Sequence, residues 1–81
     1  SAEAAFRKAI YLDRGFALGH YHLGCCLERA SELRHARKAF DNVLSILAER
    51  LDDDQAPEGE GMTVAELKDL AQMHLQLIPG R

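Results

Sequence analysis

The side chains in this sequence most able to do chemistry are two adjacent cysteines and four histidines. Cys25 and Cys26 are chain neighbours, and consecutive Cα atoms about 3.8 Å apart are closer than an ordinary disulfide allows. We therefore expect free thiols and a reducing, cytoplasmic compartment. His22 and Cys26 would share one face of a helix, but two ligands are fewer than the three or four that a protein zinc site uses. The sequence predicts no metal site.

Catalysis by a thiol would need a base within hydrogen-bond reach, and His22 is the only candidate near Cys25 and Cys26 in the sequence. Cysteine is also among the residue types most often buried as an inert packing group, and this interpretation is favoured here. No Gly-rich phosphate loop follows a predicted strand. The sequence predicts no catalytic residue, no cofactor and no enzymatic activity for these residues.

Charge and hydropathy exclude several classes of partner. The basic group Arg34, Arg37 and Lys38 is small and has few aromatic neighbours, so nucleic-acid binding is not expected. The acidic run 52–54 lacks the glycine and distal glutamate of a calcium loop, so it is interpreted as solvated charge. No apolar run approaches the roughly 18 residues of a membrane helix, so no membrane insertion is expected.

Apolar residues recur at helical spacing throughout, and no β-branched run of period two occurs, so the chain is predicted to be all-α. Ser31-Glu32 is too short for anything except an antiparallel return between two helices. Thr63 and Glu66 form a capping-box pattern at the start of the last helix. Helices are expected over residues 2–12, 16–30, 33–51 and 63–78, with an acidic flexible linker over residues 52–62.

The first and third helical segments repeat each other at a distance of 34 residues. Ala2 and Phe6 align with Ala36 and Phe40, and apolar pairs continue the same register through residues 12 and 46. A generic amphipathic bundle has no reason to keep this period. The first segment is therefore interpreted as part of an earlier copy of the unit.

A 34-residue helix-turn-helix unit with this order of residues resembles the tetratricopeptide repeat (TPR). Residues 17–50 resemble one complete repeat, and residues 1–14 resemble the second helix of a partial repeat within a TPR region of residues 1–51. The resemblance implies antiparallel helical hairpins in a short right-handed superhelix, with residues 63–78 as a capping helix. The residues expected to pack the repeat are His20, Leu23, Gly24, Leu27, Ala36, Phe40, Ala2 and Phe6.

Gly24 is the least expected residue of this set, since a glycine inside a helix costs about 1 kcal/mol relative to alanine. Its presence predicts that the backbone of a neighbouring helix approaches closely there. His20 stands where the repeat has tryptophan, Leu27 where it has tyrosine, and Ala48 where it has proline.

A finer resemblance covers nearly the whole chain. The order of repeat residues followed by the acidic linker and Gly61-Met62-Thr63 is similar to the carboxy-terminal TPR region of some bacterial CheR-type chemoreceptor methyltransferases. This resemblance implies a regulatory module in chemotaxis signal transduction, attached to an S-adenosylmethionine-dependent glutamate methyltransferase. The partner would be the chemoreceptor or the methyltransferase domain itself.

In the TPR family the first helices of successive repeats line a groove that binds peptide segments. The resemblance places five residues of this chain on that face, and their spacing independently fits one side of a helix. The alternative is that this face is merely solvated or is covered by the last helix. The five groove residues are Leu18, Tyr21, Cys25, Glu28 and Arg29.

A structural role is the competing prediction for the chain as a whole. Stacked repeats need about three units to bury a continuous core, and this chain has about one and a half with a cap. The first helix would then leave an apolar face uncovered, which predicts a homodimer or packing against the parent enzyme without a separate peptide ligand.

Overall fold

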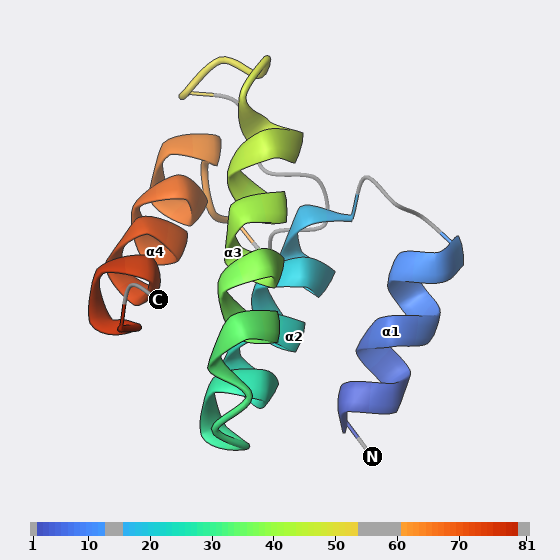
Figure 1. Cartoon of the computed structure of the whole chain (residues 1–81). Helices are drawn as coiled ribbons and strands as arrows, with labels where there is room; N and C mark the ends of the chain where they lie inside the picture. Colours follow the sequence, from blue (N-terminus) through green and yellow to red (C-terminus); the bar gives the residue numbers. More distant parts are fainter. Residues whose placement is uncertain (1, 13–15, 54–60, 80–81) are drawn as a thin grey trace.

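The computed structural model describes residues 2–12, 16–53 and 61–79, and every regular element in these residues is a helix. The helices are α1 (Ala2–Leu12), α2 (Ala17–Arg29), α3 (Leu33–Leu47) and α4 (Val64–Leu77). Consecutive helices run in opposite directions, and α3 lies between α2 and α4 (Figure 1). The prediction of an all-α chain is confirmed for the described residues.

The turn between α2 and α3 is a Schellman motif, which closes the predicted antiparallel hairpin. The amide of Ser31 donates to the carbonyl of Glu28 at 3.0 Å, and the amide of Glu32 donates to the carbonyl of Leu27 at 2.9 Å. This geometry requires Ser31 to adopt the left-handed conformation, with φ 62°. The hairpin is therefore held by backbone hydrogen bonds at a position that usually carries glycine.

α3 ends at Leu47, four residues before the predicted end at Leu51. Beyond Leu47 the backbone tightens, since the amide of Ala48 donates to the carbonyl of Ser45 and the amide of Arg50 donates to that of Leu47. Leu51 is 73% exposed, so extending the helix to this residue would bury little further apolar surface. The predicted acidic linker covers residues 52–62, and residues 54–60 of it lie outside the described residues.

The start of α4 is fixed by the predicted capping box. The Thr63 hydroxyl accepts a hydrogen bond from the Glu66 amide at 3.1 Å, and the Glu66 carboxylate accepts one from the Thr63 amide at 2.8 Å. The carbonyl of Asp52 accepts a bond from the amide of Ala65, and its carboxylate pairs with Lys68 at 3.1 Å. These contacts tie the first turn of α4 to the chain that follows α3.

The core lies between α2, α3 and α4, and Phe40 at its centre is completely buried. Six side chains are the largest that are fully buried: Phe40, Leu27, Leu47, Leu67, Val43 and Val64.

α1 packs chiefly against α2, and its Ile10 packs against this core. Its Ala2 and Ala5 are exposed and Ile10 is half-buried, so the prediction that Ala2 packs the repeat is wrong. The side chain of Phe6, predicted to pack beside Ala2, lies outside the described ones.

Candidate functional site

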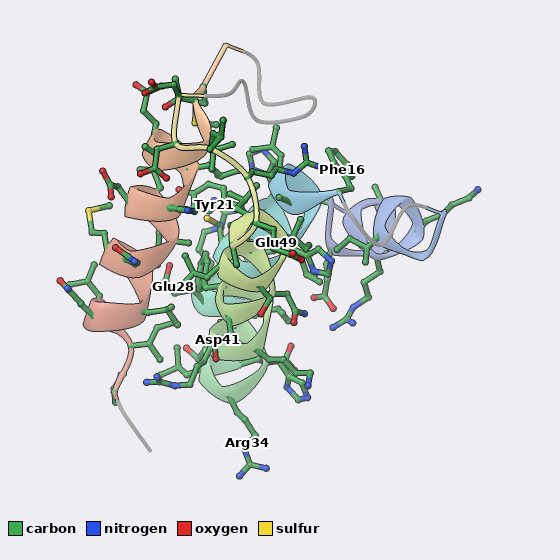
Figure 2. The ribbon with its side chains drawn as sticks, turned by 90° about the horizontal axis from the view of Figure 1, so that it is seen from above. Phe16, Tyr21, Glu28, Arg34, Asp41 and Glu49 are labelled. Atoms are coloured by element: carbon green, nitrogen blue, oxygen red, sulfur yellow. The ribbon has the colours of Figure 1, made fainter. Side chains whose placement is uncertain are left out.

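Three of the five residues on the predicted groove face of α2, namely Tyr21, Cys25 and Glu28, contact α4. Leu18 is 5% exposed and belongs to the core, whereas Tyr21, Cys25 and Glu28 are half-buried. Figure 2 shows Tyr21 and Glu28 on the side of α2 that faces α4. Arg29 is exposed. The geometry therefore agrees with the alternative, in which the last helix covers this face.

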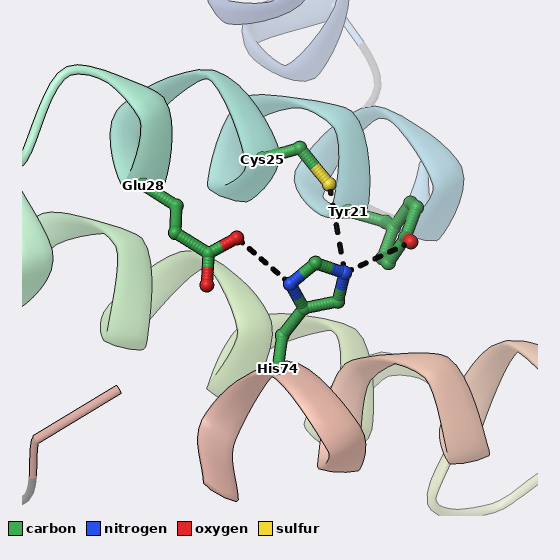
Figure 3. A network of polar contacts seen from close by, with 4 residues as sticks. All are labelled: Tyr21, Cys25, Glu28 and His74. Atoms are coloured by element: carbon green, nitrogen blue, oxygen red, sulfur yellow. Dashed lines mark hydrogen bonds and ion pairs between the residues drawn. The ribbon is translucent and has the colours of Figure 1, made fainter. Parts of the chain in front are cut away.

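A cluster of polar side chains at this contact is centred on His74 of α4 (Figure 3). The Glu28 carboxylate lies 2.8 Å from His74 Nδ1, and the Tyr21 hydroxyl lies 3.2 Å from Nε2. Because an ionised carboxylate can only accept, Nδ1 carries the proton; in the neutral ring Nε2 then accepts from Tyr21. Cys25 Sγ is 4.0 Å from the same nitrogen.

Carboxylate, imidazole and thiol occur here in the order that nucleophilic cysteine sites use. The electrostatics, however, oppose that chemistry. Burial raises the pKa of the Cys25 thiol and thereby disfavours the thiolate, which is the reactive form. The Tyr21 hydroxyl is also closer than the thiol to His74 Nε2. The arrangement is better suited to joining two helices than to activating sulfur.

Aromatic rings of α2 and α3 also pack against the imidazole ring of His74. The Phe40 ring stacks on the imidazole with centroids 4.7 Å apart and planes 14° apart. Tyr21 meets both rings edge-on, at 5.8 Å from Phe40 and 5.5 Å from His74. Burial, followed by the neighbouring negative charges, raises the pKa of Tyr21 to about 12. The cluster therefore positions α4 on α2 and α3.

Sequence reasoning counted His74 among the four histidines and gave it no functional role, although it lies at helical spacing in the apolar stripe of the last helix. The available signal was its place in that stripe, because a histidine at a core-facing position needs polar partners on an opposing helix. The base nearest to Cys25 was predicted to be His22, whereas in the structure His74 Nε2 is within 4.0 Å of the thiol.

The residues predicted to pack the repeat within α2 and α3 are buried together. A Cβ on Gly24 would lie 2.8 Å from the ring of Phe40, so a group of α3 does approach Gly24 closely. The approaching group is an aromatic side chain, where a backbone was expected. The buried members of this set are His20, Leu23, Gly24, Leu27, Ala36 and Phe40.

A second candidate site is a pocket of about 330 Å³ between α1, α2 and α3. Apolar side chains of α1 and α2 form its floor, and exposed basic side chains of α1 and α3 stand at its rim. The floor consists mainly of Ile10, Leu23 and Leu27, with Ala39 and the buried imidazole of His20 also in the lining. The rim carries Arg7, His35 and Lys38, and the half-buried Asn42 completes the lining.

Two of the three basic side chains at the rim have acidic neighbours on their own helix or beside it. Arg7 Nε donates to the Glu3 carboxylate at 3.0 Å, and His35 Nδ1 is 3.9 Å from the Glu32 carboxylate. Lys38 makes no ion pair with any residue in the described part of the chain. The described lining of the pocket contains no acidic side chain. Sequence analysis had considered Lys38 only as part of a weak basic patch.

Among residues 2–12, 16–53 and 61–79, no three His, Cys, Asp or Glu side chains are grouped as metal ligands. None of the helices formed by these residues has the length and apolar character needed to cross a membrane. Comparison with protein-family profiles, curated proteins and solved structures gives no match to this chain.

Proposed function

We propose that this chain is a non-catalytic protein–protein interaction module of the TPR type. In its α2–α3 hairpin the residues that the repeat pattern selects are buried, among them Leu23 and Leu27, and Gly24 lies against Phe40 of α3. The 34-residue register between α1 and α3 supports the same assignment. We include in this proposal that the α2–α3 hairpin is part of a short right-handed superhelix and that α4 is its capping helix.

The observation that carries the proposal is the pocket between α1, α2 and α3. It offers a partner apolar surface together with exposed charge, which is the composition of a binding patch. The face of α2 predicted to bind a peptide is covered by α4, so a partner that leaves the fold intact would use the pocket instead. Binding there would not require the His74 cluster to open.

From the sequence resemblance, we further propose that the module regulates or targets an attached chemotaxis-type methyltransferase. Isothermal titration calorimetry of the chain with a CheR-type catalytic domain and with a chemoreceptor cytoplasmic domain tests this. Binding to either is expected, and deletion of residues 1–81 from the parent chain should change receptor methylation. If the chain binds neither domain, and deletion of residues 1–81 leaves receptor methylation unchanged, the regulatory role is excluded.

A structural role is the second candidate, because apolar side chains remain uncovered outside the pocket. Leu77 is 72% exposed and Met73 49% exposed on α4, and Ala2 and Ala5 are exposed on α1. A second copy or the parent enzyme would cover such surface. Sedimentation equilibrium distinguishes the two candidates, since a monomer at all concentrations argues against self-association.

A further inference from the structure

We propose that the pocket between α1, α2 and α3 binds an acidic peptide segment in which a carboxylate side chain lies next to an aliphatic one. The aliphatic side chain enters the pocket, and the carboxylate meets the basic rim at Lys38 and Arg7. This inference rests on the proposed function as an interaction module, and it names the chemistry of the partner.

The floor of the pocket selects an aliphatic group. Leu23 and Leu27 lie at its base with 7% and 1% of their surfaces exposed, and Ile10 closes it from α1. A volume of about 330 Å³ is at the lower end of the range of small-molecule sites, about 300 to 1,000 Å³. A space of this size fits one or two side chains of a peptide better than a bulky cofactor.

The rim selects negative charge. Lys38, Arg7 and His35 are exposed at the pocket edge, and no acidic residue is among its described lining. Glu3 offsets part of the charge on Arg7 through its bond to Nε, whereas Lys38 has no ionic partner among the described residues. Lys38 is therefore the residue whose charge a bound carboxylate would neutralise.

The first test uses a fluorescent eight-residue peptide of alternating glutamate and leucine, titrated into the purified chain and followed by anisotropy and methyl NMR. Methyl signals of Ile10, Leu23 and Leu27 should shift, and those of Val64 in α4 should not. Peptides with glutamine for glutamate, or with serine for leucine, should bind at least about tenfold more weakly. Equal binding of the glutamine peptide overturns the inference.

Charge reversal provides the matched comparison. Lys38→Glu should weaken binding of the acidic peptide about tenfold, since attraction becomes repulsion. Arg34→Glu changes the net charge by the same amount on the same helix, but Arg34 does not line the pocket, so less than a twofold effect is expected. A peptide with lysine in place of glutamate should bind better to Lys38→Glu than to the parent chain.

Two further measurements distinguish the carboxylate peptide from a phosphorylated peptide and from a second copy of the chain. A peptide with phosphoserine for glutamate that binds more than tenfold tighter would overturn the carboxylate assignment in favour of phosphate. If the parent chain self-associates and Lys38→Glu abolishes this, the occupant of the pocket is a second copy of the chain and the inference is overturned. Residues 51–81 of such a copy carry seven acidic and two basic side chains.

The inference and the proposed function can fail separately. If the chain binds a methyltransferase or receptor domain and Lys38→Glu leaves that binding unchanged, the inference is wrong and the proposed function stands. If the peptide and both protein domains fail to bind, both are wrong.

Discussion

The ring of Phe40 lies 2.8 Å from the point that a Cβ on Gly24 would occupy. The ring cannot easily retreat, because it is fully buried and stacked on His74. Gly24→Ala should therefore destabilise the fold by about 1 kcal/mol, as an overpacking cost of about 1–3 kcal/mol outweighs the gain of about 1 kcal/mol in helix propensity. Gly24→Leu should unfold the α2–α3 hairpin. Urea denaturation followed by circular dichroism measures both changes.

A double variant tests whether the ring of Phe40 is the cause. Phe40→Leu shrinks the side chain that faces Gly24, so Gly24→Ala should cost less in the Phe40→Leu background than in the parent. Additive costs would show that another contact limits the space at residue 24. If Gly24→Leu were as stable as the parent, the close-approach argument itself would fail.

The hairpin turn offers a substitution that should stabilise the protein. Ser31 adopts φ 62°, a conformation that costs a residue with a Cβ about 1–2 kcal/mol and glycine almost nothing. After the larger entropy that glycine loses on folding, Ser31→Gly should raise the free energy of unfolding by about 0.5–1 kcal/mol. Ser45→Gly at an exposed position in the last turn of α3 is the matched control and should lower it by about 0.5 kcal/mol.

Local patterns were enough to predict the helices and their connections. Apolar spacing located all four helices, the short Ser31-Glu32 link predicted the antiparallel hairpin, and the Thr63 and Glu66 pair predicted the capping box. Each of these features depends on residues within about one helical turn of one another. The end of α3 was misplaced by four residues because Leu51 matches the apolar pattern but is 73% exposed.

The arrangement of α4 could not be deduced in the same way. The position of His74 against Tyr21 and Glu28 joins residues 46 to 53 positions apart, and no local pattern specifies which face of α2 receives the last helix. The sequence left open whether the predicted groove face was exposed or covered. The pocket was missed for a related reason, since its rim and floor come from three helices.

Tyr21 contributes both a ring and a hydroxyl to the contact between α2 and α4. Tyr21→Phe keeps the edge-on contacts with Phe40 and His74 but removes the hydrogen bond to Nε2, so a loss of about 1 kcal/mol is expected. Tyr21→Ala also removes the ring and should cost about 3 kcal/mol. Thermal denaturation of the two variants and of the parent chain measures both losses of stability. Equal stability of Tyr21→Ala and the parent would show that the ring does not support α4.

Alkaline pH should weaken the fold through the same residue. Tyr21 has its pKa raised to about 12 in the folded chain, against about 10 when unfolded, so the folded state retains the proton over that interval. Stability is therefore full below about pH 10 and falls as the pH rises toward 12. Cys25 acts in the same direction, because burial raises its thiol pKa.

The alkaline prediction is checked by the free energy of unfolding at several pH values, together with the ultraviolet absorbance of tyrosinate. Tyr11→Phe leaves Tyr21 as the only reporter. Tyr21→Phe should flatten the fall in stability above pH 10. An unchanged slope in Tyr21→Phe would assign the pH dependence to other groups.

Arg37 of α3 holds the carboxyl end of α4, since its guanidinium donates to the carbonyls of Ile78 at 3.0 Å and Pro79 at 2.8 Å. Arg37→Gln shortens the side chain and removes the charge, so the last turn of α4 should fray at a cost of about 1 kcal/mol. Hydrogen exchange of the Ile78 amide, which donates to the His74 carbonyl, reports this fraying directly.

Two variants define what Arg37 contributes. Arg34→Gln removes an equal charge from an exposed position on the same helix and should leave exchange at Ile78 unchanged. Arg37→Lys keeps the charge, but its shorter side chain places no nitrogen where Arg37 Nη2 donates to both carbonyls, so it should protect Ile78 less well than arginine. Protection in Arg37→Gln equal to that of the parent would mean that capping and the His74 cluster suffice to hold α4. Faster exchange confined to the last turn would instead identify Arg37 as the link between α3 and the end of the chain.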